Sequence, residues 1–385
     1  MVTRAIAPAI CVLAASAAVL LGSSVALAAP TFYGYIKLDA SLDSAKTDKG
    51  DYAFIVLPYV GEEADDEFNM TANQTRLGMK FDAAEGERFP VSGRVEIDFY
   101  GGGAENKANP MMRQAYLEMT FPAFEVLAGQ TADLISPLNP TTLNYVVLWK
   151  SGNTGYRRPQ IRLTKAVSLA DAGKLTLAAS ANRNMGRDEN GEDFGQPSWQ
   201  GRVGYSRKLF GDRSLTVGVS GLYGKESDAD DCEFESSAIV VDATIPLGEK
   251  ITVMGEYFSG RNLGVYLGGV GQGIAVQPPY ESSRSRAEMA EIEASGWWGQ
   301  LAVQLAADIA VNVGAGWDDP TLPVWAAADA IEKNTTYYGN VIWSATTSSY
   351  IGFEYAKMET EYAGSGDDTP AYENTRVQLS VGYRF

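Results

Sequence analysis

The sequence predicts an all-β protein: a transmembrane antiparallel β-barrel of about sixteen strands with one loop folded inward. The clearest observation is the segment Tyr372–Phe385, in which apolar and polar residues alternate strictly from Thr375 onward. Successive side chains of a strand point to opposite faces, so this strand has one apolar and one polar face. Similar segments recur along the chain, and the connections between them alternate between short and long. That combination is typical of barrels that cross a membrane.

Alternation and the turns that bound it predict sixteen strands, an even number that such barrels adopt. The expected strands are 32–41, 69–81, 91–100, 113–121, 124–130, 158–167, 174–182, 199–209, 215–224, 235–245, 251–261, 296–308, 309–316, 335–345, 349–358 and 372–385. Short turns are expected at 83–89, 122–123, 170–173, 210–213, 246–250 and 346–347, with long acidic or Gly-rich stretches between them. Short periplasmic turns opposite long external loops fit a barrel, and no blade-length repeat of a propeller is present.

The N-terminus has the pattern of a secretory signal peptide covering residues 1–28. Arg4 is followed by an apolar run from Ala5 to Leu21 and by Ala26-Leu27-Ala28, which fits a small-x-small cleavage site. Cleavage after Ala29 fits almost as well, and an uncleaved membrane anchor is the alternative. We therefore expect residues 29–385 to form one barrel domain in the outer membrane of a Gram-negative bacterium.

Composition excludes several classes of function. The formal net charge of −17 opposes binding to nucleic acid through its phosphates. The chain has no His, and of its two Cys residues Cys11 lies in the predicted signal while Cys232 remains. A Ser/His or acid/His hydrolase site is therefore impossible, and Cys/His metal sites of ordinary spacing are excluded. We expect no enzymatic activity, no cofactor and no metal centre.

The polar face of each strand should line the interior, because Arg or Lys at the bilayer midplane costs about 2–4 kcal/mol. In Val91–Tyr100 the residues Arg94, Glu96 and Asp98 share one side, and in the strand 296–308 Gln304 lies opposite Val303. Aromatic residues gather near strand ends, where two interfacial girdles are expected. They are Phe32, Tyr33, Trp199, Trp297, Trp298, Trp317, Tyr337, Tyr338, Tyr383 and Phe385.

Residues 131–157 form the most unusual connection. Pro137 and Pro140 stiffen it by fixing φ, and it is rich in Leu, Ile and Val and contains Trp149, which does not suit a solvated loop of such length. We expect a constriction loop packed on the inner wall, with polar groups that line the passage: Asp133, Ser136, Asn139, Asn144 and Lys150. Packing against a neighbouring subunit or the barrel mouth is the alternative.

A basic ladder is expected along the lumen. Its members are Arg76, Arg94, Arg157, Arg158, Arg162 and Arg202. A guanidinium offers a planar fork of donors that matches a carboxylate, and a row of such groups would let an anion leave water in small steps. The alternative is that these residues form structural ion pairs with lumen carboxylates such as Glu96 and Asp98.

Three stretches carry a resemblance to a known family: Gly129–Arg162, Phe32–Asp39 and Asn73–Leu77. Together they resemble the DcaP-like trimeric outer-membrane porins over most of the predicted mature chain. The resemblance implies a sixteen-stranded homotrimer with a constriction loop and a basic pore that favours anions such as dicarboxylates. The terminal Phe385 is similar to the signal that outer-membrane barrels present to the barrel-assembly machinery, and the apolar face implies outer-membrane lipid as a partner.

Two functions from different classes follow. The first is a passive diffusion channel for small hydrophilic solutes. The second is a plugged barrel that binds partners through its long loops; it is the weaker hypothesis because no plug domain precedes Phe32 in the predicted mature chain. Acidic runs at Asp65–Glu67, Asp228–Asp231 and Asp318-Asp319 could bind divalent cations, although such runs more often are solvated loop tips.

Overall fold

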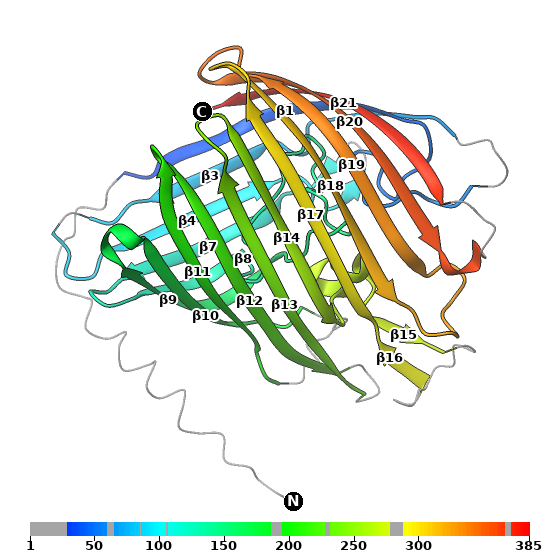
Figure 1. The fold of residues 1–385 in the computed structure, drawn as a ribbon, viewed down its shortest axis with the longest axis horizontal. Helices are drawn as coiled ribbons and strands as arrows, with labels where there is room; N and C mark the ends of the chain where they lie inside the picture. The colour runs from blue at the N-terminus through cyan, green and yellow to red at the C-terminus, as the bar shows by residue number, and fades with distance from the viewer. Residues whose placement is uncertain are drawn as a thin grey trace, which may run out of the picture.

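The computed structural model describes residues 29–385 except 60–64, 85, 105–106, 186–194, 228–231, 278–287 and 366–370. The predicted signal peptide therefore lies outside the described residues. In the described part of the chain, one antiparallel sheet closes into a barrel (Figure 1). Its strands are β1 (Thr31–Asp43), β2 (Glu67–Thr71), β3 (Arg76–Phe81), β4 (Val91–Asp98), β7 (Met111–Thr120), β8 (Glu125–Ala132), β9 (Arg157–Ser168), β10 (Lys174–Asn182), β11 (Ser198–Phe210), β12 (Arg213–Ser227), β13 (Glu233–Pro246), β14 (Ile251–Arg261), β17 (Glu293–Gln304), β18 (Ile309–Thr321), β19 (Ile331–Trp343), β20 (Ser349–Tyr362) and β21 (Tyr372–Arg384).

The barrel closes where the first strand pairs with the last. β1 pairs antiparallel with β21 from Tyr35↔Arg384 to Asp43↔Arg376. On its other side β1 pairs with both β2 and β3, which are two halves of one crossing separated at residues 72–75. The sheet of 17 described strands therefore occupies sixteen positions around the barrel, and the predicted fold class is confirmed.

The small elements are not strands of this wall. Short hairpins are formed by β5 (Gly103–Ala104) with β6 (Lys107–Ala108) and by β15 (Ile274–Val276) with β16 (Met289–Glu291). Single 3₁₀ turns are η2 (Ala170–Ala172), η3 (Gly264–Tyr266), η4 (Gly269–Gly271) and η6 (Ala363–Ser365). Among the described residues, no helix has the length and apolar character needed to cross a membrane.

All sixteen predicted strands are present, with two corrections to their extent. The strand expected at 69–81 is interrupted, and the Lys37 backbone N–H there donates to the Thr75 hydroxyl at 3.2 Å. The strand expected at 296–308 ends at Gln304, because the chain turns over residues 305–308 before β18 begins. Several strands also run further toward the long loops than their alternating segments indicate, notably β18 and β20.

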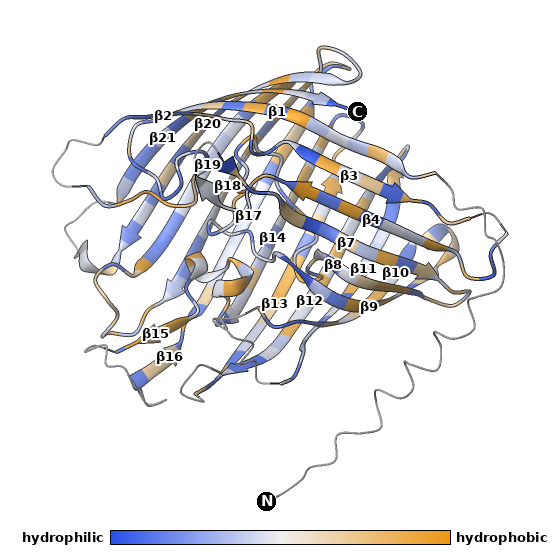
Figure 2. Ribbon diagram, turned by 180° about the vertical axis from the view of Figure 1, so that it is seen from behind, coloured by the Kyte–Doolittle hydropathy of each residue, from blue (hydrophilic) through white to orange (hydrophobic). Residues whose placement is uncertain are grey.

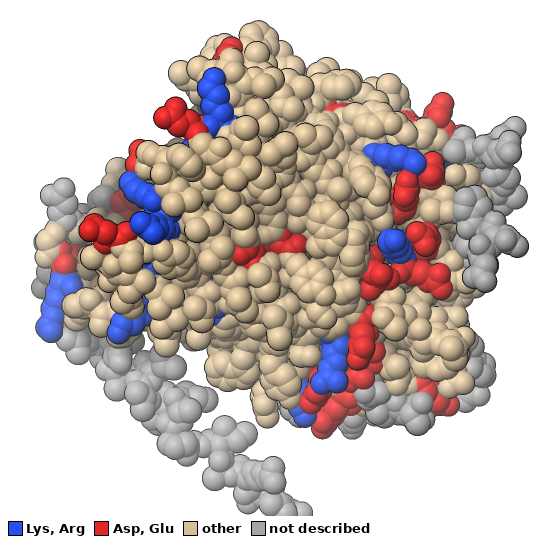
Figure 3. Space-filling model, viewed as in Figure 1, with Lys and Arg blue, Asp and Glu red and all other residues tan. Residues whose placement is uncertain are grey.

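The two faces of the wall differ as the alternation predicts. Outward side chains such as Leu163 at 52 % and Val219 at 52 % stay exposed, while inward neighbours such as Gln200 at 3 % and Ser220 at 2 % are buried. Hydrophilic and hydrophobic residues alternate along the strands in Figure 2. The outer face is largely uncharged in its middle, and Lys, Arg, Asp and Glu gather toward the strand ends (Figure 3). The apolar band meets lipid, so the lumen must take the polar set.

The prediction of the aromatic girdles is wrong for some members. Trp199 and Tyr337 are about half exposed on the outer face, as expected. Trp298 is 1 % exposed and Tyr338 is 4 % exposed, and both face the interior. The physical reason is the two-residue period of a strand: adjacent aromatic residues cannot both face lipid.

Candidate functional site: the barrel lumen and its inward loops

The connection between β8 and β9 folds into the lumen and follows the inner wall. Its backbone N–H groups donate to side chains on strand after strand: Leu134 to Gln200 of β11 at 2.7 Å, Leu138 to Glu256 of β14 at 2.9 Å, Thr141 to Gln300 of β17 at 2.5 Å and Leu143 to Glu354 of β20 at 2.6 Å. Further along, the Tyr145 hydroxyl contacts Asp98 of β4 at 3.3 Å. The inward position of the loop is confirmed, and the alternative of packing at the barrel mouth is not what the structure shows.

Two buried carboxylates anchor this inward loop. Glu256 accepts from the Ser136 hydroxyl, from the Leu138 N–H and from the Trp298 indole at 3.2 Å. Glu354 accepts from the N–H groups of Leu143 and Asn144, at 2.6 and 3.0 Å, and from the amide of Asn340 at 2.9 Å. A buried carboxylate needs such donors, and the loop needs acceptors for N–H groups that form no sheet. The carboxylates accept from the loop N–H groups, so both sets of groups are hydrogen-bonded and the loop is fixed to the wall through its main chain.

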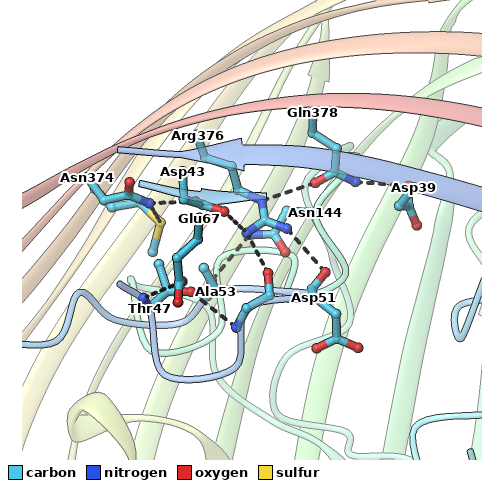
Figure 4. A network of polar contacts seen from close by, with 12 residues as sticks. Asp39, Asp43, Thr47, Asp51, Ala53, Glu67, Asn144, Asn374, Arg376 and Gln378 are labelled. Atoms are coloured by element: carbon cyan, nitrogen blue, oxygen red, sulfur yellow. Dashed lines mark hydrogen bonds and ion pairs between the residues drawn. The ribbon is translucent and has the colours of Figure 1, made fainter. Parts of the chain in front are cut away.

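The first long loop also folds inward, over the Arg376 side chain of β21 (Figure 4). Arg376 is 1 % exposed, binds Asp43 at 2.8 Å and donates to the carbonyls of Gly50 and Asp51 at 3.2 and 3.1 Å. The Asn144 amide reaches the Ala53 carbonyl at 3.2 Å. The first loop therefore lies on the inward loop and adds a second layer at the external end of the lumen.

A third inward segment follows β14 and contains η3. The Tyr266 carbonyl accepts from the Gly155 N–H at 2.6 Å and from the Thr154 hydroxyl at 2.8 Å. The Arg158 guanidinium lies 3.9 Å from the centre of the Tyr266 ring and binds Asp133 at 2.6 Å. These contacts lock the C-terminal end of the inward loop to the segment that follows β14, and the Arg158–Asp133 pair joins the two ends of the loop.

The remaining passage lies along the wall built from β3, β4, β7 and β9. Inward side chains of the opposite wall are covered by the loops, as Asn312, Asn340 and Gln378 at 2–3 % exposure show. On the first wall, several inward side chains keep partial exposure, among them Arg76, Arg94, Gln114, Tyr116, Glu118 and Arg162. From the loop side, Pro137, Asn139 and Thr141 are exposed. A solute crossing at the level of the loop must therefore pass between these two sets.

Three arginines of the predicted ladder have carboxylate partners. Arg158 binds Asp133 and is almost fully buried. Arg202 holds Asp242 through both terminal nitrogens, the longer contact being 2.8 Å. Arg76 is 3.5 Å from Glu96 and lies 5.3 Å from the centre of the Tyr35 ring. The ion-pair hypothesis thus describes Arg158 and Arg202 well and Arg76 partly.

The other three arginines contact neutral groups within the described residues. Arg94 donates to Gln114 at 3.3 Å and lies over the Tyr33 ring at 5.4 Å. Arg162 donates to Gln160 at 3.0 Å and to the Ala132 carbonyl at 2.6 Å. Arg157 donates to the Tyr156 hydroxyl at 2.6 Å and is buried. Arg94 and Arg162 therefore keep an accessible positive charge facing the passage.

The lumen carboxylates Glu96 and Asp98 are held by a residue that sequence analysis missed. Arg113 donates to Glu96 at 3.1 Å and to Asp98, and it lies 5.7 Å from the centre of the Tyr145 ring. The β4–β7 register shifts at Glu96/Ile97, so Arg113 is the extra residue of a β-bulge. A bulge re-aims a side chain, and strict alternation would have placed Arg113 outside. Glu256 and Glu354 were also missed, because nothing in an alternating strand marks the residue that a distant loop will contact.

The remaining predicted site residues lie in three places. Ser136 and Asn139 join the loop's internal network through Asn153, at 3.1 Å each. The Lys150 ammonium lies over the Phe54 ring at 4.7 Å, and burial lowers the pKa of Lys150. Gln304 is exposed at the end of β17 and donates to the Ala306 carbonyl at 2.8 Å, so it braces the turn at the lumen's rim.

Among the described residues, no group of three or more Cys, Asp or Glu side chains is arranged to hold a metal ion. Asp318, one of the acidic candidates, instead accepts the N–H groups of Gly269 and Val270 at 3.1 and 3.0 Å. The run Asp228–Asp231 lies outside the described residues. The site therefore consists of charged and amide side chains around a passage, which can attract, orient and pass a solute.

A closed sixteen-position barrel with a narrowed polar lumen defines a porin, and the chain belongs to the Gram-negative porin family, whose model matches residues 14–385. Family and fold make it an outer-membrane diffusion channel and indicate a channel rather than an enzyme. No match to the chain is found among curated proteins.

Three solved structures are similar in fold. The outer membrane channel DcaP of Acinetobacter baumannii has a TM-score of 0.75 at 19% identity, over 94% of this chain and 99% of that one. An anion-selective porin from Comamonas acidovorans has a TM-score of 0.59 at 11% identity, over 93% and 99%. OmpT of Vibrio cholerae, in its trimer form, has a TM-score of 0.54 at 10% identity, also over 93% and 99%. The predicted resemblance to DcaP is confirmed for the fold.

Proposed function

We propose that this porin favours small anions, with dicarboxylates among its solutes, and that Arg94 and Arg162 set the preference. The observation that supports it is that several lumen carboxylates are paired with arginines, whereas two lumen arginines are not paired with a carboxylate. Asp98, Asp133 and Asp242 are each bound to an arginine. Arg94 and Arg162 contact neutral partners and remain accessible.

The acidic net charge of the chain does not oppose this proposal. A permeating ion responds to charges within about 8–10 Å at physiological salt, because more distant exposed charges are screened. Glu256 and Glu354 are covered by the inward loop, so they lie behind it when viewed from the passage. Glu118 and Glu125 are accessible carboxylates on the same wall, and they should weaken the preference rather than reverse it.

The proposal includes assembly and export. We expect a homotrimer, as the family resemblance and the trimer form of a structural neighbour suggest, and export through a signal peptide cleaved after Ala28 or Ala29. Phe385 would be presented to the barrel-assembly machinery. The Phe385 backbone pairs with Gly34 at 3.2 and 3.1 Å, at the seam that closes the barrel.

The test is solute flux into proteoliposomes. Succinate should enter faster than a neutral sugar of similar size, and R94Q/R162Q should slow succinate while leaving the sugar almost unchanged. Lys165→Gln is the matched control, since Lys165 is on β9 three residues from Arg162 but faces outward. Equal slowing of both solutes would instead indicate a change of pore size. Succinate flux unaffected by R94Q/R162Q would remove the role assigned to these arginines.

A further inference from the structure

Two cations lie side by side on the lumen wall, toward the short-turn end of the passage: Lys80 of β3 and Arg94 of β4. They are directly opposite each other in the antiparallel register of these strands, which are neighbours in Figure 1. Residues in this relation have Cβ atoms about 4.5–5.5 Å apart, and like charges at that spacing destabilise a sheet. The sequence therefore keeps an unfavourable pair at this point of the wall.

The ring of Tyr33 on β1 supports both cations. Its centre lies 5.0 Å from the Lys80 ammonium and 5.4 Å from the Arg94 guanidinium. The ring extends across β3 because Gly78 leaves the space free: a Cβ at residue 78 would lie 2.4 Å from the ring. The Tyr33 hydroxyl reaches Glu96 of β4 at 2.9 Å. A neutral ring thus positions the two charges without cancelling them.

The carboxylates of this part of the wall are committed elsewhere. Glu96 is two residues further along β4 and is bound by Arg113 at 3.1 Å and by Arg76 at 3.5 Å. Glu118 of β7 is opposite Ser92 rather than opposite either cation. Within the part of the chain that the structure describes, the two cations contact neutral groups. Their repulsion is relieved only when an anion from solution joins them.

The spacing of the pair selects the class of anion. A guanidinium presents a planar fork of donors and an ammonium presents a point charge with three donors. A group that carries two negative charges on one centre can accept from both cations at once, as the phosphate and sulfate dianions do. A dicarboxylate divides its charge between two separate groups, so one of them would lie away from the pair. Chloride compensates only one of the two cations.

We propose that Lys80 and Arg94 form a binding site for a compact tetrahedral dianion, phosphate or sulfate, within the passage. The inference rests on the proposed function, because it takes Arg94 as an accessible lumen charge. It adds Lys80 to the site and names a class of solute that a general anion preference does not specify. A dianion bound there obstructs the passage of other ions while it stays.

Single-channel recording in dilute KCl tests the proposal. Potassium sulfate, potassium phosphate in alkaline buffer and potassium succinate are added in separate arms at equal ionic strength. The measurement is the concentration of each anion that halves the conductance. Lys80→Gln removes one charge of the pair. Lys174→Gln is the matched control, because Lys174 of β10 also faces the lumen beside a short turn but is opposite Ser168 and Ser206.

Sulfate and phosphate should lower the wild-type conductance at concentrations at which succinate has little effect. K80Q should raise the half-inhibitory concentration about tenfold, because a hydrogen bond to a charged group is lost, whereas K174Q should leave it almost unchanged. K80R keeps the charge and should retain the inhibition. In KCl alone, K80Q and K174Q should shift the reversal potential by similar amounts, since each removes one lumen charge.

Three outcomes would overturn the site. Equal loss of inhibition in K80Q and K174Q would mean that the dianions respond to the total charge of the lumen. Succinate that inhibits as strongly as sulfate would remove the selection for a compact dianion. An anion-preferring wild-type channel that neither sulfate nor phosphate inhibits would refute the site alone. A cation-preferring channel that both dianions inhibit in a Lys80-dependent way would instead refute the proposed anion preference and keep the site.

Discussion

Removing the Glu354 carboxylate should release the inward loop and make the channel wider and noisier. In Glu354→Ala, the N–H groups of Leu143 and Asn144 lose the side-chain acceptor that they share, while the surrounding wall stays in place. A buried donor left without a partner costs about 1–3 kcal/mol, so two such donors cost about 2–6 kcal/mol. Even the lower value changes the ratio of anchored to released loop about 30-fold.

The loop retains other contacts, which bound the effect. The Leu143 carbonyl still accepts from the Lys37 ammonium at 2.8 Å and from the Gln378 amide at 3.0 Å. We therefore expect fluctuation between two conductance levels in E354A, and a larger mean conductance in E256A/E354A, where both anchors are absent. Glu354→Gln keeps one acceptor oxygen and should lie between the wild type and E354A.

Single-channel recording in planar bilayers measures this effect, with heat-modifiable mobility as the check that the barrel has assembled. Glu359→Ala is the matched control, because Glu359 is on the same strand but faces outward and binds Lys357 at 2.8 Å. Assembled E256A/E354A channels with wild-type conductance and noise would refute the anchoring role of these carboxylates.

Three further predictions concern the wall and the loops. Leu177→Arg should destabilise the assembled barrel by about 2–4 kcal/mol because Leu177 faces lipid. Thr176→Arg on the same strand should assemble and alter conductance. Quantitative folding assays measure the first effect and single-channel recordings the second. Replacing Leu134–Trp149 with a Gly/Ser bridge should raise conductance in an assembled barrel, and unchanged conductance would mean that the loop does not limit the passage. Arg376→Met should cost about 3–5 kcal/mol by leaving Asp43 buried without its partner, and faster trypsin cleavage of the first loop would report it; wild-type cleavage would show that the ion pair does not hold that loop.

Alternation predicted most of the barrel because it is a local property. A lipid-facing residue must be apolar whatever its neighbours do, so Ile161 and Leu163 reveal that Arg162 faces the lumen. The same rule misplaces residues wherever the period breaks. Arg113 shares a bulge and turns inward, and Trp298 follows another Trp and cannot share its face.

The partners of the lumen charges could not be predicted from local pattern. Arg158 and Arg162 are four residues apart, yet Arg158 is held by Asp133 of the inward loop while Arg162 contacts neutral groups. The difference arises from where the loop runs across the wall, which depends on contacts far apart in the sequence. The apolar content of the loop predicted that it would be covered, but not that Glu256 and Glu354 would receive its N–H groups.

The reversal potential in a gradient of dilute KCl tests the central claim most directly. The wild-type porin should show a mild anion preference, R94Q/R162Q should shift the potential toward cations, and K165Q should not. The preference should fade at 1 M salt, where the screening length is about 3 Å. A wild-type channel that prefers cations in dilute salt would contradict the account, because Glu118 and the other lumen carboxylates would then outweigh Arg94 and Arg162.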